Sequence, residues 1–182
     1  MADQELRDIC NRIYQKYKTA IDLIVNNSDM DSAKGQMLSG IKTALKEYAD
    51  EGKIKYSDGV IFYTKEMDEI IPDMDSPISS WGNTKIYQNW FEVWDKRITI
   101  HFEIAGKNLS EEQDKLVDCL MDLTKPHTKS KPFVWKRLIN LKRDFPDTEN
   151  NVAENAYKIA KDLLDELLAR EKTIYEKLKK KA

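Results

Sequence analysis

The chain has 182 residues, of which 34% are charged, and its net charge of −2 balances 30 basic against 32 acidic side chains. This length is typical of one domain with a substantial core. The balance excludes the large positive excess of a general nucleic-acid coat protein, while local patches remain open. Cys10 and Cys119 lie in separate helical patterns with no Cys or His nearby, which indicates a reducing compartment and no zinc site.

The N-terminal residues and the hydropathy of the chain predict its cellular location. Residues 1–10 are polar and acidic, unlike the basic and then apolar start of a signal peptide. No uninterrupted apolar stretch approaches the roughly 20 residues that a membrane span needs. The sequence therefore predicts a soluble, cytoplasmic protein with no membrane partner.

Two helices are expected in the first 52 residues. Apolar residues recur at spacings of three and four over residues 6–24, which predicts an amphipathic helix. A second helix is expected to begin at Asp31 or Ser32, either of which can cap it, and to close at Gly52. Gly35 and Gly40 weaken this helix by roughly 1 kcal/mol each if exposed, or they let another element approach closely.

The next segment reads as a short hairpin followed by a brief helix. Ser57-Asp58-Gly59 separates two runs of strand-forming residues, 54–56 and 60–63, which predicts a tight turn between two strands. A brief helix is expected within residues 66–75 and is broken at Pro72.

Two apolar strands, 85–94 and 97–104, are expected to form a tryptophan-rich hairpin whose turn is Asp95-Lys96. The second strand alternates with a period of two, as a half-buried strand requires. Its two faces carry Ile98, Ile100, Phe102 and Ile104 on one side, and Thr99, His101 and Glu103 on the other. The first strand is partly apolar on both faces, with Tyr87, Phe91 and Val93 opposite Ile86, Trp90 and Trp94. Such a strand is either covered twice or presents a surface to a partner.

A third helix, another strand and a long last helix complete the chain. Ser110 and Gln113 are spaced as a capping box at the start of the third helix. Residues 133–141 alternate as a strand, and the last helix is expected from about Val152 to nearly the end. Ala160, Leu164 and other apolar residues of this helix form a second seam, which leaves open a homodimer contact or packing back on the sheet.

This order of elements predicts a single α+β domain over residues 1–182. It has a helical part (1–52), a small antiparallel sheet with one embedded helix (53–142) and a long C-terminal helix (148–182). The N-terminal helices are expected to pack the sheet.

No catalytic, metal or cofactor site is predicted. The six glycines form no phosphate-binding loop, and neither cysteine has an activating neighbour. His101 and Glu103 point the same way on one strand and resemble a base with its orienting carboxylate. We interpret them as a surface pair on the sheet, and His127 as a solvated loop residue.

Two charge blocks are the candidate binding residues. The acidic block contains no Lys or Arg and carries Glu66, Asp68, Glu69, Asp73 and Asp75. The basic block contains no acid and carries Lys125, Lys129, Lys131, Lys136, Arg137, Lys142 and Arg143. Phe133 and Trp135 lie within the basic block, and basic side chains interleaved with aromatic ones suit phosphate contact and base stacking. Both blocks are also compatible with solvated loops.

Several segments together resemble the C-terminal region of a bacterial and phage PD-(D/E)XK nuclease family. They are Pro77-Ile78-Ser79-Ser80-Trp81-Gly82-Asn83, the tryptophan-rich hairpin, Gly106-Lys107-Asn108-Leu109 and Phe133-Val134-Trp135-Lys136, together with residues 9–18. The resemblance covers nearly all of the chain but only the non-catalytic half of the family. This resemblance implies that Trp81, Trp90 and Trp135 pack the sheet against its helices.

The nuclease signature itself is missing from the sequence. Such a nuclease needs an acid on one strand and a (D/E)-x-K motif on the next, which hold a divalent metal and activate water. The only E-x-K is Glu51-Gly52-Lys53, at an expected helix end. The resemblance therefore implies an accessory domain without nuclease activity.

In size and general character the whole chain also looks like a type II-A anti-CRISPR protein. This resemblance implies a non-enzymatic phage inhibitor that acts in the bacterial cytoplasm on a type II CRISPR effector nuclease with its guide RNA. The acidic block is the expected contact, because the effector reads DNA with arginines in a positive channel. The alternative is a nucleic-acid-binding accessory domain that uses Lys129, Lys131, Lys136, Arg137, Lys142 and Arg143.

Overall fold

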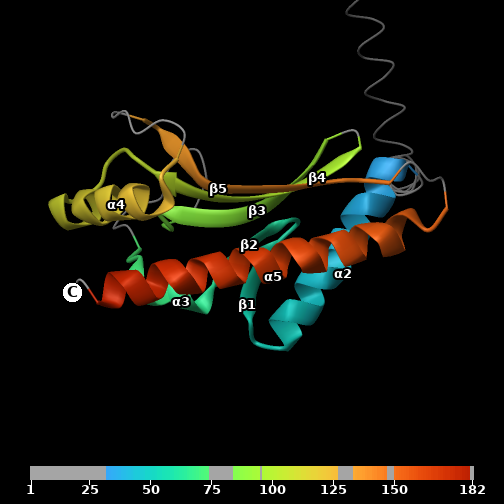
Figure 1. The fold of residues 1–182 in the computed structure, drawn as a ribbon, viewed down its shortest axis with the longest axis horizontal. Helices are drawn as coiled ribbons and strands as arrows, with labels where there is room; N and C mark the ends of the chain where they lie inside the picture. The colour runs from blue at the N-terminus through green and yellow to red at the C-terminus, as the bar shows by residue number, and fades with distance from the viewer. Residues whose placement is uncertain (1–31, 74–83, 95, 127–132, 147–149, 181–182) are drawn as a thin grey trace, which may run out of the picture.

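The computed structural model describes residues 32–73, 84–94, 96–126, 133–146 and 150–180 (Figure 1). The helix predicted over residues 6–24 lies outside these ranges. So do Asp75, Trp81, His127, Lys129 and Lys131.

The fold is α+β, as the order of elements predicts. The strands are β1 (Ile54–Asp58), β2 (Ile61–Thr64), β3 (Tyr87–Trp94), β4 (Arg97–Ala105) and β5 (Trp135–Asp144). The described helices are α2 (Ala33–Asp50), α3 (Lys65–Ile70), α4 (Glu111–Thr124) and α5 (Val152–Lys179). The five strands form one antiparallel sheet in the order β1-β2-β3-β4-β5, so each strand pairs with the next in sequence.

Local sequence signals set the ends of these elements. The Ser32 hydroxyl accepts a hydrogen bond from the Gly35 amide at 3.0 Å and caps α2. Gly52 follows α2 with φ +70, a left-handed conformation that glycine adopts without steric cost. Ser110 and Gln113 form the predicted capping box at the start of α4. These predictions are confirmed.

α2 and α5 lie on one side of the three long strands and contact each other (Figure 1). The Tyr48 hydroxyl donates to the Asp165 carboxylate at 2.6 Å and links the two helices. Gly40 lies where they approach most closely, because a Cβ there would be 2.1 Å from the Ala153 carbonyl oxygen. The expectation that a small residue admits another element is therefore confirmed at this position.

The core lies between the sheet and these two helices. Ile98, Ile100, Phe102 and Ile104 of β4 are all fully buried. The same sheet face carries Asn89, whose amide donates to Glu171 of α5 at 2.9 Å, so this is the side that faces the helices. Within the described residues, no helix is long and apolar enough to cross a membrane.

Two expectations are wrong, and for the second seam of α5 the structure shows one of the two alternatives that the sequence left open. His101 and Glu103 are 1% and 4% exposed, and each pairs with a different residue, so their interpretation as an exposed surface pair is wrong. Trp135 is 46% exposed, and Trp90 lies on the sheet face that points away from α2 and α5, so neither packs the sheet against those two helices. Ala160 and Leu164 of the second α5 seam are fully buried within this chain, which uses that seam for its own core.

Candidate functional site on the open face of the sheet

The sheet face opposite α2 and α5, which we call the open face, carries a continuous row of interacting side chains. The register places Trp90 of β3 opposite His101 of β4, and Glu103 of β4 opposite Arg137 of β5. Because side chains alternate along a strand, these residues share the face that points away from the helices. The row consists of Trp135, Arg137, Trp90, His101, Glu92 and Trp94, and we call it the aromatic row.

Arg137 is the centre of the aromatic row. Its guanidinium carbon lies 5.5 Å from the ring centre of Trp90 and 5.5 Å from that of Trp135. Its Nε donates to the Glu103 carboxylate at 2.6 Å, and the Glu103 side chain is only 5% exposed. A cation between two aromatic rings, fixed by a buried carboxylate, is held in one conformation. The row is therefore rigid at this point.

His101 continues the row on the other side of Trp90. The two ring centres are 4.6 Å apart, and His101 Nε2 lies 3.1 Å from a Glu92 carboxylate oxygen. Burial lowers the pKa of His101 and outweighs the opposing effect of its hydrogen bond to Glu92. The imidazole is therefore neutral at neutral pH.

This histidine and its carboxylate are poorly placed for acid–base catalysis. A general base has to reach the proton that it abstracts, whereas His101 is 1% exposed. Its Nδ1 and the indole Nε1 of Trp90 are both buried without a hydrogen-bond partner. This geometry favours a structural role for His101 within the aromatic row.

Both ends of the aromatic row are exposed to solvent. Trp94 is 67% exposed and Trp135 is 46% exposed, and with Val134 they are the exposed large hydrophobic residues of the described ranges. Trp94 pairs with Arg97 and Trp135 pairs with Ala105 in the sheet. Arg97 and Ala105 are eight positions apart on β4, which places the backbones of the two tryptophans about 27 Å apart along the strand direction.

The charges on the open face nearly cancel. Arg97 pairs with Asp144 at 2.9 Å, and Arg137 pairs with Glu103. Lys142 faces the same way, because it lies opposite Thr99. Glu92 provides a further negative charge beside His101, and its pKa is lowered by hydrogen bonds from Trp94 and His101 although burial opposes this shift. The face therefore lacks a strong positive excess.

Three described members of the acidic block, Asp68, Glu69 and Asp73, pair with lysines from other segments. Asp68 lies 2.5 Å from Lys55 Nζ and 3.0 Å from Lys85 Nζ, and accepts from the Tyr87 hydroxyl at 2.8 Å. Burial raises the pKa of Asp68, but these hydrogen bonds outweigh it and lower the pKa overall. Lys85 also pairs with Asp73 at 2.9 Å.

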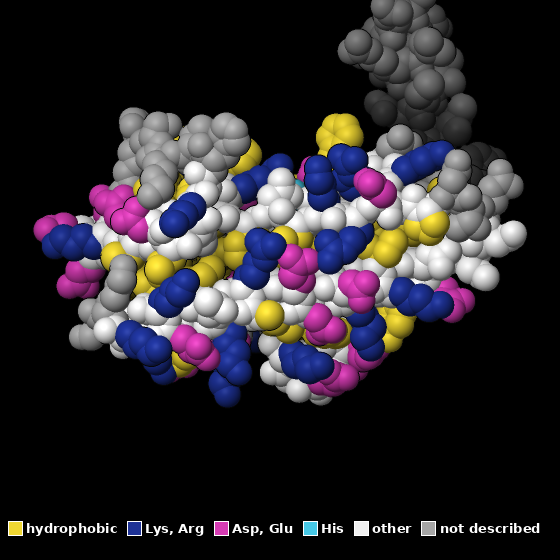
Figure 2. All heavy atoms as spheres, in the orientation of Figure 1, with side chains coloured by type: hydrophobic (Ala, Val, Ile, Leu, Met, Phe, Trp, Pro, Cys, Tyr) yellow, Lys and Arg dark blue, Asp and Glu magenta, His cyan; other side chains and the backbone are white. Residues whose placement is uncertain are grey.

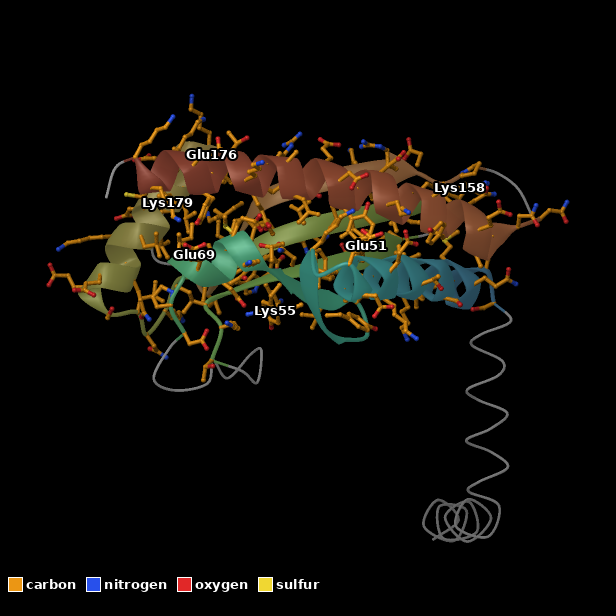
Figure 3. All side chains as sticks on the ribbon, turned by 90° about the horizontal axis from the view of Figure 1, so that it is seen from below. Glu51, Lys55, Glu69, Lys158, Glu176 and Lys179 are labelled. Carbon is orange, nitrogen blue, oxygen red and sulfur yellow. The ribbon has the colours of Figure 1, made fainter. Side chains whose placement is uncertain are left out.

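The neighbouring Glu69 of α3 pairs with residues near the C-terminal end of α5. It accepts from the Tyr175 hydroxyl at 2.5 Å and from Lys179 Nζ at 2.9 Å, and these bonds lower its pKa (Figure 3). Glu66 is half-buried on α3. The structure thus brings Asp68 and Asp73 together on Lys85, and places Glu69 against α5.

The basic block is divided between two sides of β5. Arg137 and Lys142 lie on the open face, opposite Glu103 and Thr99, whereas Lys136 and Arg143 point to the other side. Arg143 donates to Glu166 of α5 at 2.8 Å. The described members of this block therefore do not form one continuous basic surface.

The E-x-K segment does not build a metal site. Glu51 and Lys53 form an exposed ion pair at 2.6 Å in the turn after α2 (Figure 3). Among the residues that the structure describes, no group of three or more His, Cys, Asp or Glu side chains is placed to hold a metal ion.

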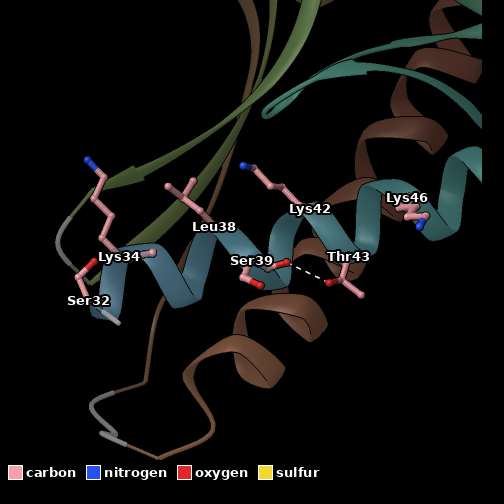
Figure 4. A pocket seen from close by; sticks show the side chains of 8 residues that line it. Ser32, Lys34, Leu38, Ser39, Lys42, Thr43 and Lys46 are labelled. Carbon is pink, nitrogen blue, oxygen red and sulfur yellow. Dashed lines mark hydrogen bonds between the residues drawn. The ribbon is translucent and has the colours of Figure 1, made fainter. Parts of the chain in front are cut away.

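A hollow of about 580 Å³ lies along α2 (Figure 4). Its described lining carries Lys34, Lys42 and Lys46 together with Leu38, and no acidic side chain. The described lining therefore favours contact with anions.

The sequence reasoning missed one buried polar group. Glu171 of α5 is 1% exposed and accepts from Asn89, while its second carboxylate oxygen has no partner. The sequence contains a signal for this burial, because Leu167, Glu171 and Ile174 follow the i, i+4, i+7 spacing of a buried helix face.

Comparison of the chain with family models, with curated proteins and with solved structures gives no match. The fold and the candidate site therefore stand on the geometry described above.

Proposed function

We propose that this protein is a non-enzymatic binding protein whose open face docks a partner protein. The observation that carries the proposal is the exposure of Trp94 and Trp135 at the two ends of the rigid aromatic row. Tryptophan and arginine dominate the energetic centres of protein interfaces. Because Arg137 and Trp90 are already fixed, docking on this face costs little side-chain entropy.

The charge of the open face supports a protein partner over a nucleic acid. Proteins that bind nucleic acids neutralise several phosphates and need an excess of lysine and arginine at the contact. Here Arg97 and Arg137 are paired with Asp144 and Glu103. Interface centres are poor in free charge and rich in aromatic residues, as this face is.

The partner that we propose is a type II CRISPR effector nuclease loaded with guide RNA. The support is the resemblance of the chain to type II-A anti-CRISPR proteins in size and character, together with a docking face built from tryptophans. The lysine partners of Asp68 and Glu69 favour the aromatic row over the acidic block as the main contact.

A cleavage assay tests both the function and the surface. We expect the purified protein to block target DNA cleavage at a near-stoichiometric ratio. Replacing both exposed tryptophans, Trp94→Ala with Trp135→Ala, should raise the protein concentration needed for inhibition by at least about tenfold. The control variant, Lys158→Ala with Glu176→Ala on the exposed side of α5, should inhibit like the wild type (Figure 3). Uninhibited cleavage at large excess of the wild type would rule out this target.

A nucleic-acid-binding accessory domain is the second candidate, because Trp135, Arg137 and Lys142 lie on one face. Filter binding to single-stranded and duplex DNA as a function of salt separates the two functions. A steep salt dependence that weakens in Lys142→Gln would favour the accessory domain. We expect only weak binding at physiological salt.

A further inference from the structure

The sheet has one long edge strand. β5 has ten residues and pairs only with β4 within the described chain. The other edge, β1, has only five residues, and a short edge strand offers little for further pairing. Both edges carry one irregularity, β1 between Tyr56 and Asp58 and β5 opposite Phe102 and Glu103. The outer backbone N–H and C=O groups of β5 therefore provide the longer template for an added strand.

A crevice of about 220 Å³ lies beside this edge, between β5, α4 and α5. Its floor is apolar and consists of Leu123, Leu138, Ile139 and Ile174. Figure 2 shows hydrophobic side chains gathered between α4 and α5, with lysines and arginines along their border. In strand addition, backbone hydrogen bonds supply affinity and such pockets select alternate side chains of the added segment.

The border of the crevice is positively charged. Arg170 and Lys177 line it, and Arg143 lies nearby on β5. Arg143 and Arg170 share the single carboxylate of Glu166, at 2.8 and 2.7 Å, so one positive charge remains on this pair. With Lys177, the border retains a positive charge that an acidic partner would neutralise.

A second copy of the chain is a poor occupant of the edge. Two β5 strands paired antiparallel about their centre would place Lys136 opposite Arg143 and Arg137 opposite Lys142. Like charges that face each other across a strand pair are destabilising. Arg137 and Arg143 already pair with Glu103 and Glu166, so the attraction for acidic side chains on an added strand comes mainly from the lysines of this edge and of the crevice border.

We propose that the β5 edge and its crevice bind an extended acidic segment of a partner protein by strand addition. The segment would place one apolar side chain in the crevice and acidic side chains near Arg170 and Lys177. This inference requires no particular identity of the partner and is separate from the contact on the aromatic row.

Fluorescence anisotropy with a synthetic peptide tests the proposal on the full chain. The probe is a fluorescein-labelled decapeptide in which every second residue is threonine and the residues between read Glu-Glu-Leu-Glu-Glu, so that one leucine and its neighbouring glutamates share the face toward the crevice. Two control peptides are the same sequence with alternate backbone nitrogens methylated and the same sequence with lysine in place of glutamate. We expect saturable binding of the first peptide, and at least about tenfold weaker binding of both controls, because they lack edge hydrogen bonds or carry the wrong charge.

Matched variants locate the site. Thr173 is exposed and lines the crevice, so Thr173→Trp should fill it and weaken binding about tenfold. Lys172→Trp introduces the same bulk at the neighbouring exposed position outside the crevice and should bind nearly normally. Far-ultraviolet circular dichroism confirms that both variants fold.

Three results would overturn the proposal. Equal binding of the methylated peptide excludes strand addition, and an unchanged affinity in Thr173→Trp excludes the crevice. A dimer at high concentration that Thr173→Trp dissociates would make a second copy the occupant. Because the peptide assay contains no nuclease, its outcome is independent of the inhibition assay.

Discussion

Glu171 shows how one buried carboxyl couples the stability of this protein to pH. Burial raises the pKa of Glu171 to about 7, and the Thr64 hydroxyl and the Asn89 amide, which both act in the opposite direction, only partly offset this effect. The unfolded chain therefore loses this proton near the usual glutamate pKa, while the folded chain keeps it until nearly neutral pH. The folded state binds more protons in this window, so the stability falls as the pH rises through it.

We expect Glu171→Gln to raise the free energy of unfolding at pH 8 by on the order of 2–3 kcal/mol, because the glutamine carries no charge to bury. At pH 4 the two proteins should be nearly equally stable, since the glutamate is then neutral in both states. Urea unfolding at the two pH values measures this difference. Other titrating groups, such as His101, contribute equally to the pH dependence of both proteins, so their contributions cancel in the stability difference. A stability difference that is independent of pH would contradict this account.

The two ion pairs between β4 and β5 provide a comparison of buried and exposed charge. The Glu103 side chain is 5% exposed and binds Arg137 at 2.6 Å, whereas the Asp144 side chain is 82% exposed and binds Arg97 at 2.9 Å. Glu103→Gln should lower the free energy of unfolding by about 1–3 kcal/mol, because it leaves Arg137 without its buried partner. Asp144→Asn should change the stability little. Similar losses from both variants in thermal unfolding would show that burial does not distinguish the pairs.

At the scale of the elements, the contact between α2 and α5 depends on the absence of a side chain at Gly40. An alanine Cβ there would lie 2.1 Å from the Ala153 carbonyl oxygen and 2.8 Å from the Tyr157 amide nitrogen. Both atoms belong to the backbone of α5, so relief requires the helices to separate.

Gly40→Ala should therefore destabilise the protein by about 1–3 kcal/mol, although alanine has the higher helix propensity. Ser39→Ala, at the adjacent exposed position of α2, should be neutral or slightly stabilising, because only the propensity changes. Chemical denaturation of the two variants gives the comparison. A stabilised Gly40→Ala protein would mean that α2 and α5 are not in contact at this position.

The sequence predicts the described elements because their signals are local. Ser32, the Ser110–Gln113 box and the alternation of β4 each act within a few residues. What covers each strand face is not local. The burial of His101 depends on neighbours from β3 and β5, and periodicity alone could not reveal it.

The same limit applies to the candidate binding residues. The acidic block has no lysine within it, but Lys55, Lys85 and Lys179 pair with its members from 13, 17 and 110 residues away in sequence. Likewise, Arg137 meets Glu103 only because β4 and β5 pair, 34 residues apart. A charge block read along the chain therefore overstates the charge that the folded surface presents.

At the scale of the whole molecule, α5 joins the parts of the described chain. It contacts α2, α3, α4, β4 and β5, and Leu167 is fully buried near its middle. A helix that packs against the other helices and against part of the sheet makes separate unfolding of the sheet and the helices unfavourable. We therefore expect one cooperative unfolding transition, as a single domain requires.

Two probes test this expectation, since tryptophan fluorescence reports on the sheet through Trp90 and far-ultraviolet circular dichroism reports mainly on α2 and α5. Their thermal transitions should coincide. Leu167→Ala should lower the free energy of unfolding by about 2–5 kcal/mol and shift both transitions equally, because the cavity lies in the shared core. A Leu168→Ala control, at a partly buried position on the same helix, should shift both transitions less. If Leu167→Ala shifts only the circular dichroism transition, the helices and the sheet unfold separately and the chain is not one cooperative domain.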